Sequence, residues 1–538
     1  MADNPGISMD ITGPKMNPIS AGLRITPVYT APQNTTTPSA SSVQVPAVVS
    51  TSNVTLGQTR NDSDGYTYSS RSSSASASYA LEQDSVDKLS VSLLTGIQGS
   101  SNSERFQGVG AALIEQLALK GGQSVSQSVF RYAEGTEPSA AALKLRGESL
   151  RQAPANAISL SLTTASGATI TLSLASDEHG LAVSAEVEGG ELNAYELKGL
   201  ADLADGFQAA IDGLAKEPPS LKLDGLVKFD SNLFSSLKMN ASLQTASGEP
   251  QVFDLSLDDK ARNLSLQGPS GNFKLDLDTH DSSLLGSSGQ RQAAIGNYLE
   301  QFDAARKRGN GDKDLMNLFK EAFVQLNSVD DAKQAESAGP ISGKTDRLLL
   351  SGLADFKASI GQTAKSVNPL LPTETDRFDY SVSQSTTAQG KALSSRSIQQ
   401  DQQSKLSAAW HVGANPQVPL ALGTDYKSQN YRYHEVTDEA KSSTRLGFNK
   451  DNRLVEASAT QQASQNERVR SYVDGVLTSE TNTPKSTSQT RNLLGLLTDV
   501  LQRERVSMRD KGVSVLESQL ADKRNQWWLQ GETNAIRA

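Results

Sequence analysis

The sequence predicts an α+β protein in which antiparallel sheets pack on amphipathic helices, with a disordered arm at the N-terminus. Two aromatic residues one position apart occur three times, each followed by a polar run rich in Ser, Thr and Gln: Tyr66-Thr67-Tyr68, Phe378-Asp379-Tyr380 and Tyr431-Arg432-Tyr433. A period of two places alternate side chains on one face of a strand. Other segments repeat apolar residues at three and four positions, which is typical of amphipathic helices.

The N-terminal arm is predicted over residues 1–64. These residues combine Pro, Ser, Thr, Asn and Val in no periodic order. Such a segment buries too little apolar surface to offset the chain entropy lost on folding. The first thirty residues contain no basic stretch followed by an apolar core, so we expect no Sec signal.

Residues 65–155 are expected to form a β-hairpin followed by helices. The alternation in Leu89-Ser90-Val91-Ser92-Leu93 predicts a second strand. The period then changes over residues 104–120, where apolar residues recur at helical spacing before Gly121-Gly122. A further helix is predicted over residues 138–152.

Residues 156–279 are predicted to be an antiparallel α+β domain. Ile158-Ser159-Leu160-Ser161-Leu162 alternates strictly, and a second alternating run follows a Gly-containing turn, as in a hairpin. One long helix is expected over residues 193–216, because a single apolar stripe runs through it before Pro218-Pro219. The remaining strands are predicted over residues 181–187, 226–229, 237–243, 252–257, 264–266 and 273–277.

The C-terminal half is expected to alternate between helical and β segments. Residues 288–362 predict a small helical bundle whose third helix covers about 345–360. Residues 376–480 are β-rich, and residues 488–538 form a C-terminal helical tail. The sequence leaves open whether residues 65–95 and 376–480 share one sheet.

Composition limits the classes of function. The chain has no cysteine, which excludes disulfides, thiolate metal sites and cysteine nucleophiles. Its net charge is −9 and it has no long basic run, so we expect no nucleic-acid binding. No run approaches 18 apolar residues, so no transmembrane segment is expected. We therefore expect a soluble protein, either cytoplasmic or exported without a Sec signal.

No familiar catalytic motif is present. None of the four histidines lies four residues from another, and neither a G-x-x-x-x-G-K-[ST] nor a G-x-S-x-G motif occurs. Gly108-Val109-Gly110 lacks the third glycine and the preceding strand of a dinucleotide site. The sequence therefore favours a non-enzymatic protein without a cofactor, and leaves an enzyme open.

The densest group of carboxylates is Asp276, Asp278 and Asp281, with Asp258 and Asp259 nearby. Asp276 and Asp278 would project from one face of a strand, and such a group can hold Ca²⁺. The EF-hand spacing is missing. A solvent-facing acidic strand is the alternative to a metal site.

The tail supplies the candidate for partner binding. Trp527 and Trp528 are adjacent on a predicted amphipathic helix that also carries Leu520. Tryptophan anchors protein interfaces well, so these residues are candidates for contact with a partner or a membrane surface. The alternative is that they dock on the protein's own core.

The alternating Ser/Leu strands before a Gly turn, followed by the helix that contains Leu197 and Leu214, resemble uncharacterised cysteine-free proteins of gammaproteobacteria. The resemblance implies a bacterial source and no established activity. Some of those proteins are automatically named lactate dehydrogenase. This chain does not support that name, since the glycine fingerprint and a His–Arg–Asp set are both missing.

Three functions remain open at this point. The first is a non-enzymatic structural or interaction protein that binds another protein, or itself, through exposed strands or the C-terminal amphipathic helix. The second is a substrate of a signal-less export system that acts outside the cell. The third is a carbohydrate- or Ca²⁺-binding β-module or hydrolase with an acidic site around Asp276 and Asp281.

Overall fold

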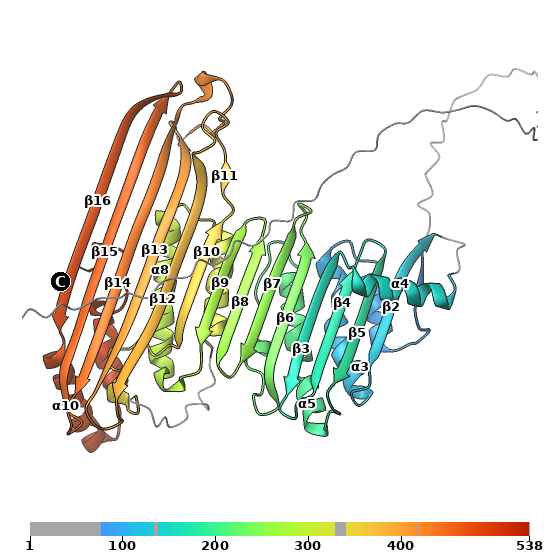
Figure 1. Ribbon diagram of the computed structural model, residues 1–538, viewed down its shortest axis with the longest axis horizontal. Helices are drawn as coiled ribbons and strands as arrows, with labels where there is room; N and C mark the ends of the chain where they lie inside the picture. The colour runs from blue at the N-terminus through green and yellow to red at the C-terminus, as the bar shows by residue number, and fades with distance from the viewer. Residues whose placement is uncertain (1–76, 134–137, 329–340, 416, 537–538) are drawn as a thin grey trace, which may run out of the picture. The chain divides into compact units, whose positions relative to one another are not determined.

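A single broad antiparallel sheet runs through the molecule (Figure 1). The computed structural model describes residues 77–133, 138–328, 341–415 and 417–536, all of which belong to the compact unit Ser72–Ala538. The predicted arm over residues 1–64 and the first aromatic pair, Tyr66 and Tyr68, lie outside the described residues.

The sheet has sixteen strands in the order β1-β2-β5-β4-β3-β6-β7-β8-β9-β10-β12-β13-β14-β15-β16, and the short β11 pairs with β12. The strands are β1 (Ala77–Leu81), β2 (Val125–Ala133), β3 (Asn156–Thr164), β4 (Thr169–Ser176), β5 (Gly180–Glu188), β6 (Phe234–Gln244), β7 (Pro250–Asp258), β8 (Ala261–Gly268), β9 (Gly271–Asp278), β10 (Asp355–Gln362), β11 (Lys365–Ser366), β12 (Thr375–Gly390), β13 (Arg396–Gly413), β14 (Tyr431–Phe448), β15 (Leu454–Val473) and β16 (Val476–Asn492).

The topology is close to a simple meander. From β6 to β9, and again from β12 to β16, each strand pairs with the strand that follows it in the sequence. All the strand pairs are antiparallel, which short hairpin connections permit. The sheet therefore joins β1 near the N-terminus with β12–β16, a connection that the sequence left open. It also passes through the segments that the sequence divided into separate domains.

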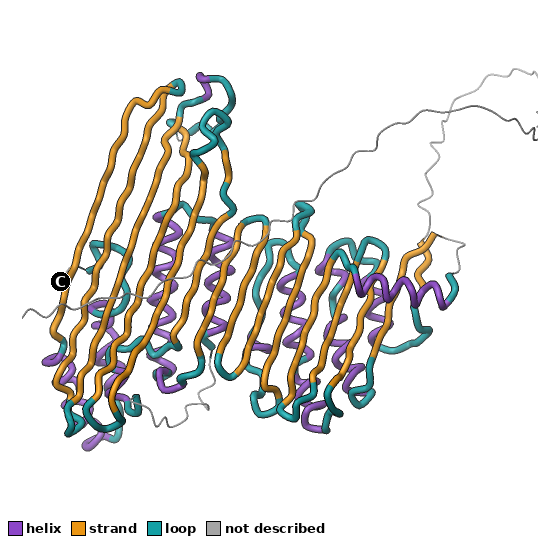
Figure 2. The backbone as a smooth tube through the Cα atoms, in the orientation of Figure 1, coloured by secondary structure: helices purple, strands orange, loops and turns teal. Residues whose placement is uncertain are grey.

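Helices cover one face of this sheet over most of its width (Figure 2). The α-helices are α1 (Lys88–Gly96), α2 (Asn102–Arg105), α3 (Val109–Leu119), α4 (Ala140–Gln152), α5 (Ala194–Asp202), α6 (Ala204–Leu214), α7 (Asp224–Val227), α8 (Ser288–Arg308), α9 (Lys313–Leu326), α10 (Leu494–Lys511) and α11 (Leu516–Leu520). The short 3-10 helices are η1 (Ser282–Leu284), η3 (Lys344–Arg347), η4 (Tyr426–Ser428) and η5 (Ala521–Gln526).

The strict alternation of β3 and β6–β9 determines which face is covered. Alternate residues are buried along the middle of these strands, so that Leu255, Leu264 and Leu275 lie side by side across β7, β8 and β9. The residues between them are mainly Ser, Asn, Asp and Lys, and they form an open polar face. The predicted antiparallel sheet on helices is thus present as one sheet with one main helical layer.

The α4 helix is the exception, because it packs on the other face. Leu143 and Leu150 of α4 contact Phe130 of β2 and form a small apolar cluster separate from the main core. Figure 1 shows α4 crossing the sheet near β2 and β5, on the side away from the other helices.

Aromatic side chains form the core beneath α8 and α9. The rings of Phe302 and Phe323 lie 5.2 Å apart, edge to face, and Phe323 contacts Phe356 of β10 at the same distance. Phe302 also approaches Tyr380 of β12, with 5.9 Å between the ring centres. Phe302 and Phe323 are both 0% exposed. The second aromatic pair, Phe378 and Tyr380, therefore lies in a strand as predicted and faces this core.

The last five strands are much longer than the others. The strands β12–β16 contain 16, 18, 18, 20 and 17 residues, whereas β6–β9 contain 8 to 11. Their ends extend past the helical layer (Figure 1). There Tyr431 and Tyr433 of β14, the third aromatic pair, form a small cluster with Tyr472 of β15.

The C-terminal tail completes the covered face beside β13–β15. Buried glutamines hold its irregular backbone: Gln402 Oε1 accepts the Leu529 backbone N–H at 2.8 Å. Gln461 Nε2 likewise donates to the Trp528 carbonyl at 2.6 Å. Amide side chains thus add hydrogen bonds to the apolar contacts that Trp527, Trp528 and Leu529 make with the core.

Two short elements differ from their prediction. Residues 89–93 form part of α1, because Asp87 caps the helix and Leu89 and Leu93, four residues apart, share its buried face. Val91 is 52% exposed, whereas a strand would place it with Leu89 and Leu93. Residues 226 and 227 belong to α7, where both are buried instead of alternating.

Two longer helices also differ. The stretch 193–216 divides into α5 and α6 at Leu203. The third helix expected over 345–360 is absent from that described stretch, which forms η3, a loop and β10. Phe356, Ala358 and Ile360 alternate in β10 with exposed or half-buried residues, so the apolar period here is two and not that of a helix.

Candidate functional site

The free edge of the sheet at β16 has the longest run of exposed residues among the described helices and strands. Among the described strands, β16 hydrogen-bonds only to β15, in a register that runs from Ser458–Asn492 to Val473–Val476. Its residues 476–486 are all exposed, on both faces of the sheet. An edge strand presents a row of backbone N–H and C=O groups without partners, which another strand can pair with.

The sequence of β16 protects this edge only in part. Natural edge strands are usually short or carry prolines and inward-pointing charges. β16 has 17 residues, and in its first fifteen only Glu480, Pro484 and Lys485 are of those kinds. The stretches 476–479 and 486–490 contain no charge and no proline. Two uncharged stretches of backbone are therefore available for pairing.

The edge is also held in place along its length. Arg468 Nε of β15 donates to Glu480 Oε1 at 2.8 Å. Arg491 Nη1 donates to Gln461 Oε1 at 2.7 Å, and its Nη2 donates to the Ile536 carbonyl at 3.1 Å. A partner would thus meet a strand that is already ordered, so that little conformational entropy remains to be lost in β16 itself.

A buried polar cluster lies where the long strands extend past the helices. Glu374 is 4% exposed and accepts hydrogen bonds from Tyr431 Oη at 2.8 Å and Tyr472 Oη at 2.9 Å. Arg470 Nη1 lies 3.1 Å from its Oε1. Although burial alone would raise the pKa of Glu374, the donors His411, Tyr431 and Tyr472 and the charge of Arg470 lower it on balance.

His411 joins this cluster from β13. Its Nδ1 lies 2.6 Å from Asp376 Oδ1, and its Nε2 lies 3.4 Å from Glu374 Oε2. Burial opposes protonation, but the two carboxylates outweigh it and raise the pKa of His411. The side chain is 0% exposed, so a substrate cannot reach it in this structure. The cluster instead anchors the segment before β12 to β13, β14 and β15.

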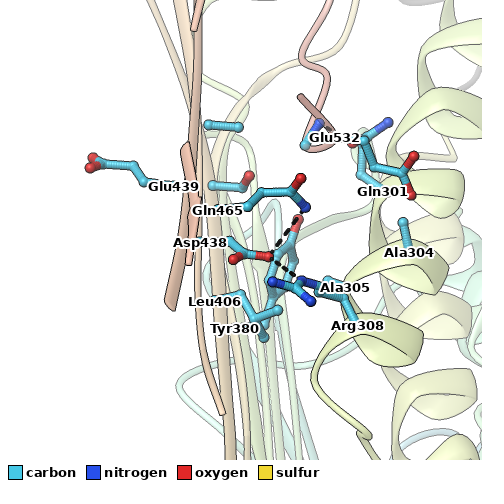
Figure 3. Close-up of a pocket in the computed structure, with 13 residues that line it drawn as sticks. Gln301, Ala304, Ala305, Arg308, Tyr380, Leu406, Asp438, Glu439, Gln465 and Glu532 are labelled. Atoms are coloured by element: carbon cyan, nitrogen blue, oxygen red, sulfur yellow. Dashed lines mark hydrogen bonds and ion pairs between the residues drawn. The ribbon is translucent and has the colours of Figure 1, made fainter. Parts of the chain in front are cut away.

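A second set of charges, partly buried, lies between the end of α8 and the sheet (Figure 3). Arg308 Nε lies 3.2 Å from Asp438 Oδ2, and Arg308 Nη1 donates to Glu467 Oε2 at 2.7 Å. Burial raises the pKa of Asp438 despite Arg308. The adjoining cavity of ≈ 50 Å³ holds one or two water molecules at most. It is too small for a substrate, so these charges join α8 to the sheet.

The three carboxylates proposed as a metal site have separate partners. Asp276 Oδ2 lies 2.9 Å from Lys274 Nζ, Asp278 accepts the His280 N–H, and Asp281 accepts the Ser283 N–H. In the part of the chain that the structure describes, no group of three or more His, Asp or Glu side chains could hold a metal ion. The geometry therefore favours the alternative, a solvent-facing acidic strand that ends in capped turns.

The candidate partner-binding residues of the tail are covered by the chain itself. Trp527 is 0% exposed, and Trp528 and Leu520 are each 3% exposed. All three belong to the main apolar core. The arrangement is the one given as the alternative, docking on the protein's own core, so these side chains present no surface to a partner in this structure.

Comparison of the chain with protein-family models, curated proteins and solved structures finds no match. No activity, substrate or fold family can therefore be carried over from a relative. Among the described residues, no helix combines the length and the apolar character that crossing a membrane requires.

Proposed function

We propose that this chain is a non-enzymatic protein that binds another protein, or a second copy of itself, by adding a strand to the free edge of β16. The observation that supports this is the length of the exposed edge: 17 residues, eleven of them consecutively exposed, paired on one side only among the described strands. Strand addition supplies affinity through main-chain hydrogen bonds, which suits a strand in which eight of seventeen residues are Ser or Thr.

The C-terminal helix is the weaker of the two expected surfaces. Trp527, Trp528 and Leu520 are buried, and what remains outside is α10, where Val506 and Met508 are 43% and 47% exposed. These isolated apolar side chains are ordinary for a protein surface. The proposal therefore concentrates on β16.

The test replaces exposed side chains of the edge by charge without disturbing the fold. In one variant, Thr478, Asn482 and Ser486 of β16 become Lys, because inward and edge lysines block strand addition. The matched control places three lysines at exposed strand positions elsewhere, Gln244, Asn272 and Gln462. Each variant gains three positive charges, so the two variants have the same net charge and differ in where the lysines lie.

Tagged full-length chains are purified from the native cells, and the mass of the purified chain alone is measured by light scattering after gel filtration. A stoichiometric partner or a defined oligomer that persists in the control and disappears in the β16 variant would support the proposal. An equal result for both variants would refute the role of β16. A monomeric chain without a stoichiometric partner would refute the interaction itself.

A further inference from the structure

A cavity lies between the sheet and the helical layer, far along the sheet from β16. Its volume is ≈ 440 Å³, within the range of about 300–1,000 Å³ usual for small-molecule sites. Its apolar walls come from α7 and α9, from the ends of β6 and β9, and from the loops after α7 and before β10. They include Val227, Phe229, Phe234, Leu277, Leu326 and Leu353. Five of these six side chains are at most 3% exposed, so the cavity is part of the core side of the sheet.

Arg262 of β8 lines this cavity. Its Nη1 donates to the carbonyl oxygens of Leu326 and Ser328, at 2.9 and 2.8 Å, and so caps the end of α9. Within the described residues, no carboxylate pairs with Arg262, and its Nε and Nη2 donate to no protein acceptor. Burial lowers the pKa of the guanidinium. Of the three guanidinium nitrogens of Arg262, only Nη1 therefore caps α9.

A partly buried cation without an anion is costly, and a guanidinium offers a planar fork that matches a carboxylate. The other charged groups around the cavity are already engaged or lie at its mouth. Asp258 is exposed and accepts the Lys260 and Ala261 N–H groups, and Asp281 is exposed and accepts the Ser283 N–H. Arg291 is buried and donates to the Gly286 carbonyl at 2.8 Å.

We propose that this cavity binds a small amphipathic carboxylate, whose acid group pairs with Nε and Nη2 of Arg262 and whose hydrocarbon chain lies against Leu277, Leu326 and Leu353. The site is independent of the strand-addition surface, since none of its residues belongs to β12–β16. A ligand with an ammonium group would instead meet Asp258, Asp259 and Asp281 at the mouth of the cavity. The experiment distinguishes a carboxylate ligand from an ammonium ligand.

Titration calorimetry on the full chain compares octanoate, octanol and octylamine, which share one hydrocarbon chain and differ in the polar end. Octanoate should bind, and octanol should bind about tenfold more weakly or worse, because it lacks the charge-assisted hydrogen bonds to Arg262. Hydrogen exchange should show protection by octanoate in the segments 277–285 and 326–328. These two measurements use the unaltered protein and need no variant.

The variant Arg262→Gln should lose octanoate binding by about tenfold or more while retaining octanol binding. The matched control is Arg131→Gln on the exposed side of β2, which should leave octanoate binding unchanged. Octanol or octylamine binding as tightly as octanoate would overturn the proposal. Absence of heat and of protection with octanoate at millimolar concentration would overturn it as well.

Discussion

Removal of the Glu374 carboxylate should loosen the projecting ends of the long strands. Glu374→Ala deletes the acceptor of the Tyr431 and Tyr472 hydroxyls and the buried partner of Arg470. Each hydrogen bond to a charged group contributes about 1.5–3 kcal/mol, and breaking a buried ion pair costs about 3–5 kcal/mol. Because these contributions overlap at one carboxylate, we expect a loss of about 3–5 kcal/mol.

The loss should be local, because the cluster lies at one end of a wide sheet. Hydrogen exchange followed by mass spectrometry measures opening free energies segment by segment. Protection should fall in residues 405–413 and 431–436 and stay constant in β3.

Two variants serve as controls. Glu374→Gln retains a hydrogen-bond acceptor and should lose less protection than Glu374→Ala. Glu115→Ala breaks an exposed pair with Lys88 and should cost under about 1 kcal/mol. Unchanged protection at 431–436 in Glu374→Ala would refute the role given to this cluster.

Three further outcomes are expected. The pKa of His411 is raised in the folded state, so protonated His411 stabilises the fold fully below the unfolded pKa of about 6.5, and this stability is lost as pH rises through the folded pKa. His411→Gln should flatten this fall of unfolding free energy with pH, as measured by denaturation curves at several pH values. Gly225→Ala should destabilise by about 1–3 kcal/mol, because its Cβ would lie 2.5 Å from the Gly206 Cα, whereas Gly296→Ala in α8 has free space and should stabilise by about 0.5–1 kcal/mol. If the chain is exported, deletion of residues 2–60 should remove it from the medium fraction in a secretome comparison, and equal recovery from both strains would contradict a role for the arm.

The period-two patterns predicted most strands, but length and context decided the ambiguous ones. Leu89-Ser90-Val91-Ser92-Leu93 fits a strand by alternation and a helix by its leucines four positions apart, and Asp87 at the N-cap favours the helix. In a run of five residues, a strand and a helix both place the first and the last residue on the same face. Only the neighbouring cap and the packing against α3 distinguish them.

Composition was misleading for the long strands. Their Ser, Thr and Gln content predicted solvated faces, yet Gln384, Gln400, Gln402 and Gln461 are at most 4% exposed. Irregular backbone needs hydrogen-bond partners: Gln402 and Gln461 supply them to the tail, and Gln384 and Gln400 supply them to the loop before β10. Such a requirement depends on a segment distant in the sequence, 127 residues away for Gln402, so local patterns do not reveal it.

The polar cluster could not be predicted from the sequence either. Glu374 and His411 are 37 residues apart and meet only because β12 and β13 pair and the segment before β12 lies across them. The sequence places only residues 476–480 of β16 in its β-rich segment and assigns residues 488–492 to the helical tail, so it does not predict this edge strand as a whole. Its position as the last strand depends on the order of the whole sheet.

The order of the strands has a consequence for how the molecule is built during synthesis. From β12 onward, every strand is covered by the strand that leaves the ribosome next, after a connection that is usually a short turn. Contacts between neighbours in sequence form quickly, since little loop entropy is lost in closing them. The edge opposite β1 is therefore uncovered at every stage from β12 onward, and it moves outward with each added strand. β16 is the position at which this succession stops within one chain.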